Sequence, residues 1–280
     1  GIELRPVCVN HSAWDNTLER RADGALALRL GFRQIKGFRE SDAAWIVAAR
    51  GNGYPDPEAL WLRGGIAPAA LERLAEADAF VGMGLTRRDA LWAVRAISAP
   101  APLPLFANPL DGEGLNEPGV RLPEMHLGEE VVEDYIALRL TLRAHPMELL
   151  RPTIPGLTPH DQLPFVPLSR ISVCGLVITR QRPGTASGVV FLTLEDETGV
   201  SNVVVWRKVY TQFRQIVMGG RLLRVTGRLQ REGIVVHLIA EKIEDLSGRI
   251  ADLGHPMDGA VGITQPQADD APRPARYPPR

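Results

Sequence analysis

The stretch GVVFLTLEDETGVSNVVVWR, residues 188–207, decides how the second half of the chain folds. Apolar and polar side chains alternate on both sides of the acidic group at 195–197, and Gly199 follows that group. Such alternation is typical of strands with one buried face, and a glycine between two such runs is typical of a hairpin. The stretch therefore predicts strands at 188–199 and 200–207 with a turn between them.

Further strands are predicted on either side of this hairpin. The same alternation appears at 171–182, 221–233 and 234–246, while 208–220 has a helical pattern ended by two glycines. Five strands with a helix between the third and fourth is the order of an OB-fold barrel. We expect this barrel to occupy residues 170–247.

The predicted barrel is basic although the whole chain is not. Residues 170–249 hold twelve Lys and Arg against seven Asp and Glu, a balance of +5 within a chain whose formal charge is −1. This split indicates a polyanionic partner for the barrel, or an ordinary solvated surface.

OB barrels bind single strands through aromatic side chains that stack on bases and cations that contact phosphates. Phe191 could instead belong to the core, and OB folds also serve as protein-docking modules. The residues that we expect to bind DNA are Arg180, Arg182, Phe191, Trp206, Arg207, Lys208 and Tyr210.

Residues 30–97 predict short helices separated by turns, in two helix-hairpin-helix motifs. In the first, IKGFRESDAAWIVAAR at 35–50, a glycine turn and the start of the next helix would aim backbone N–H groups at a phosphate. We expect Ile35 to pack on Ile46 and Ser41 to cap a helix over 42–50. The motif usually has a second glycine where this chain has Arg39. The predicted binding residues are Lys36, Gly37, Arg39 and Ser41.

A second hairpin is predicted in LAEADAFVGMGLTRRDALWAVRAI, residues 74–97. Thr86 and Asp89 form a capping-box signature before the second helix. Cations in the first turn of that helix oppose its dipole, which favours an external anion or plain solvation. The predicted binding residues are Gly82, Gly84, Thr86, Arg87 and Arg88. Packing without DNA contact is the alternative for both hairpins.

The remaining segments connect these two parts. Residues 98–127 predict a Pro-rich linker, 128–151 a helical segment and 152–169 a second linker. Residues 248–280 lack periodicity and predict a disordered tail. The expected fold class is thus multidomain α + β, with a tandem helix-hairpin-helix α-domain followed by a five-stranded OB-fold β-barrel.

Catalytic and metal-binding signatures are missing from the sequence. No phosphate-binding loop or nucleophile elbow occurs, the six histidines do not cluster at ligand spacing, and the acids at 195–197 fall in a turn. We expect no catalytic residue, metal or cofactor in this chain. Two widely separated cysteines and no apolar run of membrane length predict a cytoplasmic chain without a membrane partner.

The order of these parts resembles the C-terminal part of bacterial C-family DNA polymerases, closest to their error-prone, damage-tolerant branch. The resemblance covers residues 1 to about 258, and 1–29 would be the end of the fingers region. The segments that carry it are RPVCVNHSAWDNTLE (5–19), LGFRQIKGF (30–38), AALERLAEADAF (69–80), RRDALWAVRAI (87–97), DYIALRLTLRAHPM (134–147) and GVVFLTLEDETGVSNVVVW (188–206).

The resemblance implies that the chain is truncated at both ends. It also implies an intact enzyme that adds nucleotides on a template and copies past lesions, with magnesium and deoxynucleoside triphosphates at a palm that this chain lacks. The chain alone is expected to be an inactive part of a DNA polymerase. Its hairpins would hold primer-template duplex, and its barrel would hold single-stranded template.

Two other functions fit the sequence. The chain could be a protein-interaction scaffold that docks a sliding clamp, companion polymerases or other mutagenesis proteins. It could also be an independent single-strand-binding module, although this leaves the hairpins and residues 1–29 unexplained.

Overall fold

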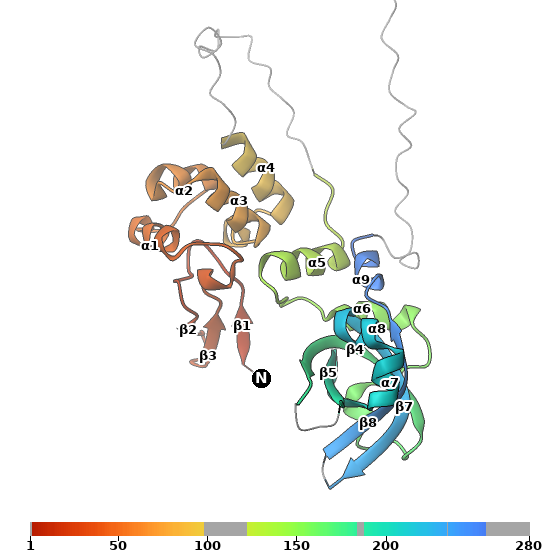
Figure 1. The fold of residues 1–280 in the computed structure, drawn as a ribbon. Coiled ribbons are helices and arrows are strands. Elements are labelled where there is room, and N and C mark those ends of the chain that lie inside the picture. Colours follow the sequence, from red (N-terminus) through yellow and green to blue (C-terminus); the bar gives the residue numbers. More distant parts are fainter. Residues whose placement is uncertain (1, 98–121, 184–187, 234, 256–280) are drawn as a thin grey trace, which may run out of the picture.

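The computed structural model describes residues 2–97, 122–183, 188–233 and 235–255. A small sheet and a group of short helices form the first region, and a β-barrel forms the second (Figure 1). Helices α5 (Leu127–Ala137) and α6 (Pro146–Leu150) lie between the two regions.

The extended segment at the start of the chain forms a three-stranded sheet. Its strands are β1 (Glu3–Arg5), β2 (Thr17–Arg20) and β3 (Leu26–Arg29). The central strand β3 pairs parallel with β1 and antiparallel with β2. Hydrogen bonds from Arg29 and Arg5 to Glu19 outweigh burial and lower the pKa of Glu19 to about 2. This ion-paired carboxylate joins all three strands.

Residues 30–97, here called the hairpin unit, fold into short helices. They are η1 (Phe32–Gln34), α1 (Glu40–Ala49), α2 (Pro57–Gly64), α3 (Pro68–Glu76), η2 (Val81–Met83) and α4 (Arg87–Ile97). Asp56 caps the start of α2, since its side chain accepts a hydrogen bond from the Ala59 N–H at 2.7 Å. Ile35 and Ile46 are both buried in the core of the unit, as expected.

The predicted cap of α1 is wrong. The helix begins at Glu40, its N-cap is Arg39 with extended backbone, and Ser41 lies inside the first turn. The N–H groups of Asp42 and Ala43 donate to the Arg39 carbonyl, so the chain enters the helix before it reaches the serine.

The end of α5 belongs to the core of the hairpin unit. Ala137 and Leu138 are buried among its apolar residues, and the Lys36 N–H donates to the Ala137 carbonyl at 2.8 Å. His145 then caps α6, because its Nδ1 accepts a hydrogen bond from the Met147 N–H. The helical segment thus joins the hairpin unit to the barrel as a packed element.

The predicted five-stranded barrel is confirmed. The strands β4 (Arg170–Gln181), β5 (Val190–Asp196), β6 (Gly199–Val205), β7 (Leu222–Glu232) and β8 (Val235–Asp245) close in the order β4-β5-β6-β8-β7. The helix expected between β6 and β7 is divided into α7 (Arg207–Gln212) and α8 (Arg214–Gly219). A Cβ at Gly227 would lie 2.0 Å from the Ile239 carbonyl oxygen, so only glycine fits where β7 shifts register against β8.

The described start of the predicted tail is folded. Residues Arg249–Asp252 form α9, and Leu253 is buried beside Met147, Leu150 and Leu222. The second predicted linker contains η4 (Arg151–Thr153) and η5 (His160–Gln162). Residues 98–121 of the first predicted linker and 256–280 of the tail lie outside the described residues.

Cys8 and Cys174 are free and buried, and burial raises the pKa of the Cys174 thiol to about 12. Within the described part of the chain, no helix has both the length and the hydropathy of a membrane span.

Candidate nucleic-acid interface

The first hairpin has the expected glycine turn. Gly37 has a φ of +71°, in the left-handed region that favours glycine, and Arg73 donates to its carbonyl oxygen at 2.6 Å. The next helix, α1, has no side chain capping its N-terminus, so its first N–H groups are the usual unpaired donors.

The charges around the start of α1 disfavour a phosphate there. Glu40 and Asp42 both lie in its first turn. The Arg39 guanidinium, predicted to contact DNA, donates to both carboxylate oxygens of Asp42 at 3.0 and 3.1 Å. An anion at this helix start would therefore meet two carboxylates and a cation already paired.

The second hairpin uses its two glycines differently. Gly84 has a φ of +76° and open space around its Cβ position, which marks the turn. Gly82 instead packs closely, since a Cβ there would lie 2.7 Å from Cys8 Sγ. Thr86 and Asp89 form half of the predicted capping box: the Asp89 N–H donates to Thr86 Oγ1 at 3.2 Å, while that hydroxyl, in place of the Thr86 N–H, donates to the Asp89 carboxylate.

Arg87 and Arg88 both turn towards α5. Arg87 is 1% exposed and pairs with Asp134 and with Glu130, the latter at 2.7 Å. Arg88 pairs with Glu129 at 2.5 Å and donates to the Pro123 carbonyl at 2.6 Å. The two cations hold α4 against α5, and their predicted contact with DNA stays a prediction.

On the barrel, exposed aromatic and cationic side chains gather where β5 begins and β6 ends. Trp206 directly follows β6 and is 54% exposed, and Phe191 on β5 is 38% exposed. Phe191 pairs in register with Val204 and Gln181, which brings these two aromatics onto neighbouring strands. Arg207 and Lys208 are exposed in the first turn of α7, and their side chains make no hydrogen bond or ion pair to any described residue.

The other predicted barrel residues take part in packing. Tyr210 is buried, with the Arg182 guanidinium 5.1 Å from its ring centroid. Arg180 donates to the Val217 carbonyl at 2.8 Å and to the Gly220 carbonyl, so it closes the C-terminal end of α8. Arg182 remains exposed beside Tyr210, so we take Trp206, Phe191, Arg207, Lys208 and Arg182 as the candidate interface, called here the barrel face.

One buried polar group was not expected from the sequence. Asp196, one of the acids that we expected in a turn, is the last residue of β5, is 3% exposed and accepts hydrogen bonds from Thr198, Gly199 and the His160 N–H. It also pairs with Arg151 at 2.8 Å. Burial acts to raise the pKa of Asp196, but these hydrogen bonds and the nearby His160 hold it below its ordinary value. Asp196 thus connects the segment before β4 to the barrel through Arg151 and His160.

The pKa of His160 is lowered, mainly by burial and also by the charge of Arg151. Its ring nitrogens lie 3.2 Å from the Gly199 carbonyl and 3.3 Å from Ser201 Oγ. Among the described residues, no group of three or more His, Cys, Asp or Glu is arranged to hold a metal ion.

Two family models match the chain. A helix-hairpin-helix motif matches residues 1–90, and an OB-fold nucleic acid binding domain matches residues 171–246. The first match includes the small sheet and the hairpin unit as far as the first turn of α4, and the second coincides with the barrel. Both predicted modules of the fold class are therefore confirmed.

Comparison with curated proteins shows which enzymes the chain is similar to. The chain is 80% identical over 277 residues to an error-prone DNA polymerase of Ruegeria pomeroyi, across 99% of this chain and 25% of that protein. The chain is a relative of the error-prone DNA polymerases. It is also 41% identical to error-prone DNA polymerase 1 of Rhizobium meliloti, across 96% of this chain and 27% of that polymerase.

The chain thus spans about a quarter of the length of the error-prone DNA polymerases that it matches, and the expected resemblance to them is confirmed. Among solved structures, an asparaginyl-tRNA synthetase from Pyrococcus horikoshii is 22% identical over 33% of this chain and 23% of that chain, with a TM-score of 0.29. Nothing further follows from so slight a likeness.

Proposed function

We propose that the chain is a DNA-holding region of an error-prone DNA polymerase, with the barrel face as its main contact for single-stranded template. The observation that carries this proposal is the placement of Trp206, Arg207 and Lys208. These consecutive side chains are exposed at the end of β6 on an OB barrel, and the two cations have no acidic partner in the described residues. An exposed aromatic ring beside free cations suits a base next to its phosphates.

In the intact polymerase, the hairpin unit would lie against primer-template duplex. Support comes from the glycine turns at Gly37 and Gly84 and from the helix-hairpin-helix match. Nucleotide addition with magnesium and deoxynucleoside triphosphates, and synthesis past lesions, would belong to the whole enzyme, in line with the names of the relatives.

Fluorescence anisotropy of the purified chain with labelled dT24 and with a primer-template tests the proposal. Binding should weaken as salt rises, because displaced counterions supply much of the affinity. The double variant R207Q/K208Q should lower the slope of log affinity against log salt by about 1.4 for dT24, from about 0.7 per lost phosphate contact.

A matched double variant on the same barrel is R170Q/R228Q. It removes the same charge, but both of these arginines already pair with Glu241. Its salt slope should equal that of the unaltered chain. Equal slopes for both double variants, or no binding of either DNA at low salt, would contradict the proposed function.

A second candidate function is protein docking by the hairpin unit. Trp45 on α1 and Trp92 on α4 are 65% and 61% exposed, and exposed tryptophans are enriched at protein interfaces. Binding of a sliding clamp to the unaltered chain, lost in W45A/W92A while dT24 binding remains, would support this candidate. Clamp binding that survives both substitutions would exclude these tryptophans as the docking site.

A further inference from the structure

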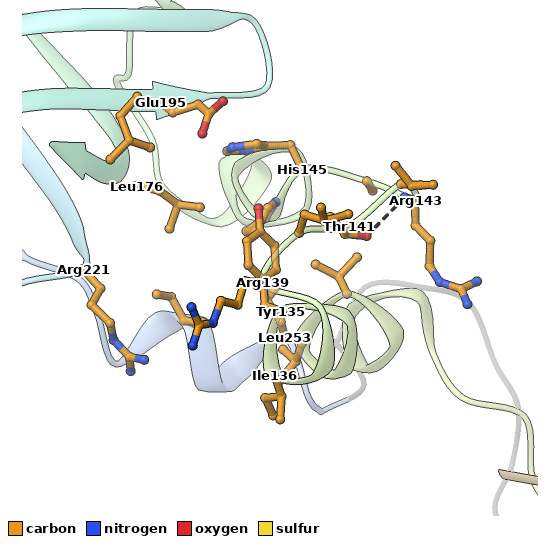
Figure 2. Close-up of a pocket in the computed structure, with 18 of the residues that line it drawn as sticks. Tyr135, Ile136, Arg139, Thr141, Arg143, His145, Leu176, Glu195, Arg221 and Leu253 are labelled. Carbon is orange, nitrogen blue, oxygen red and sulfur yellow. Dashed lines mark hydrogen bonds between the residues drawn. The ribbon is translucent and has the colours of Figure 1, made fainter. Parts of the chain in front are cut away.

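A large cavity lies where α5, α6, α9 and the barrel meet. It has a volume of about 1330 Å³, and its lining also includes Leu4 and Lys36 from the first region of the chain. On the barrel side it is bounded by Leu176 of β4 and by Glu195 of β5 (Figure 2). Ile178 of β4 also lines it. The cavity therefore adjoins both modules that the family models identify.

Three cations at this cavity are without an internal partner. Lys36, Arg139 and Arg221 are exposed, and their side chains make no hydrogen bond or ion pair to any described residue. A fourth cation, Arg143, is paired with Asp78, Glu130 and Asp134. Glu195 is the one acidic side chain among the lining residues, so the unpaired charge of the cavity is positive.

Arg139 and Arg221 reach the opening from different elements. Arg139 follows the end of α5, Arg221 precedes β7, and Figure 2 shows both guanidinium groups directed towards the same space. Neither guanidinium group is paired with a carboxylate of the lining. An anion that binds between them would therefore contact two unpaired cations.

The backbone of Arg139 sets the direction of its side chain. Arg139 follows the C-cap of α5 with a φ of +63°, and its N–H donates to the Tyr135 carbonyl, which is a common way for a helix to end. The chain turns sharply there, and the guanidinium of Arg139 stays exposed at the cavity.

The rest of the lining suits a nucleic acid strand better than a small anion. Ile136, Leu142 and Ile178 are exposed apolar residues, and Tyr135 adds a half-buried ring. Strand β4 runs from this cavity to Gln181, the register partner of Phe191 on the barrel face. A strand lying along β4 would therefore pass from the barrel face directly into the cavity.

From this geometry we infer that the cavity is a second contact for single-stranded DNA, in which Lys36, Arg139 and Arg221 bind its phosphates and the apolar wall receives its bases. The inference rests on the proposed function and extends it: the bound strand continues from the barrel face along β4 to the end of α5. Phosphate contacts of this kind are independent of base sequence.

The first test is the double variant R139Q/R221Q, titrated with labelled dT24 over a range of salt concentrations. Losing two phosphate contacts should weaken binding and lower the salt slope by about 1.4. The control R20Q/R95Q removes the same charge from two exposed arginines outside the cavity, and it should bind like the unaltered chain. Thermal unfolding of both variants establishes that they remain folded.

A second readout places the DNA in the cavity itself. Cys8 and Cys174 are buried, so a maleimide dye on Ile136→Cys will label one exposed position at the cavity. The emission of this dye should change when dT24 binds, whereas a dye on Leu62→Cys, exposed on α2, should not respond.

The outcomes separate the inference from the function on which it depends. If dT24 binding responds to R207Q/K208Q but R139Q/R221Q behaves like R20Q/R95Q, the cavity is not a DNA contact and the proposed function stands. If the unaltered chain fails to bind dT24, the proposed function fails as well. Pyrophosphate that binds and depends on Arg139 and Arg221, with dT24 binding unchanged, would replace the strand by a small anion.

Discussion

The hairpin unit and the barrel both carry cations that the sequence predicts to bind DNA, but they differ in whether acidic side chains of the same chain pair with those cations. In the hairpin unit, Arg39 pairs with Asp42, and Arg87 and Arg88 pair with acids of α5. On the barrel face, Arg207 and Lys208 pair with no acidic side chain among the residues that the structure describes. A cation in a DNA-binding motif is available to DNA only when no carboxylate of its own chain reaches it first.

The largest effect that would test this contrast is expected at Arg87. Replacing it in R87M leaves the buried Asp134 and the half-buried Glu130 with Arg143 as their remaining ion-pair partner, which should lower the free energy of unfolding by about 3 kcal/mol. Urea denaturation followed by circular dichroism measures this loss.

The neighbouring variant R88M is the control, because Arg88 is a half-exposed cation whose pair contributes about 1 kcal/mol or less. Equal losses for the two variants would show that Arg87 is not a structural cation, and would return it to the set of candidate DNA ligands.

The next effect is expected on the barrel face, at Trp206. Because stacking contributes about 1–3 kcal/mol per base, W206A should weaken dT24 binding roughly 5- to 150-fold without changing stability. Fluorescence anisotropy measures the affinity. Phe165, an 86% exposed aromatic before β4, gives the matched control F165A, and a comparable loss there would mean that stacking is not confined to the barrel face.

Acid should weaken the two regions at different pH. The folded pKa of His160 in the barrel lies below its ordinary value of 6.5, so the unfolded chain binds a proton first and stability falls as the pH drops below about 6.5. Glu19 in the small sheet has a folded pKa of about 2, so its contribution is complete above 4.5 and is lost as the pH falls towards 2.

Urea midpoints measured between pH 7.5 and 3 check this order. H160Q should flatten the decline near pH 6, whereas E19Q should flatten only the decline below pH 4.5. If the decline of the urea midpoint flattens in the same pH range for both variants, the two regions do not differ in their response to acid.

The smallest effect is expected at Arg39. Its guanidinium is 66% exposed, so loss of the pair with Asp42 in R39Q should cost about 0.2–1 kcal/mol of stability. The salt slope for primer-template DNA should not change, as measured by anisotropy. A slope lower by about 0.9 would show that Arg39 contacts a duplex phosphate despite its pair with Asp42.

The barrel was predictable because each strand carries its own alternating pattern. Phe191, Trp206 and the glycines around them locate strands and turns from local sequence alone, and the β4–β8 boundaries agree with the prediction within a few residues. Gly37 was recognisable as a turn for the same reason.

The pairing of the arginines could not be predicted in this way. Arg87 and Asp134 are 47 residues apart, and any of several acids could have met that cation. The burial of Asp196, the division of 208–220 into two helices and the fold of 249–253 also depend on tertiary contacts that no local pattern records.

The junction of α4 with α5 would hold two parts of the polypeptide together even if the chain were cut between them. The Arg87 ion pairs, the burial of Leu138 and the hydrogen bond from Lys36 to Ala137 all join residues before position 98 to residues after position 121. These contacts do not need a continuous peptide between them. Two separately produced fragments, 1–97 and 122–280, should therefore reassemble on mixing, and R87M should abolish that complementation.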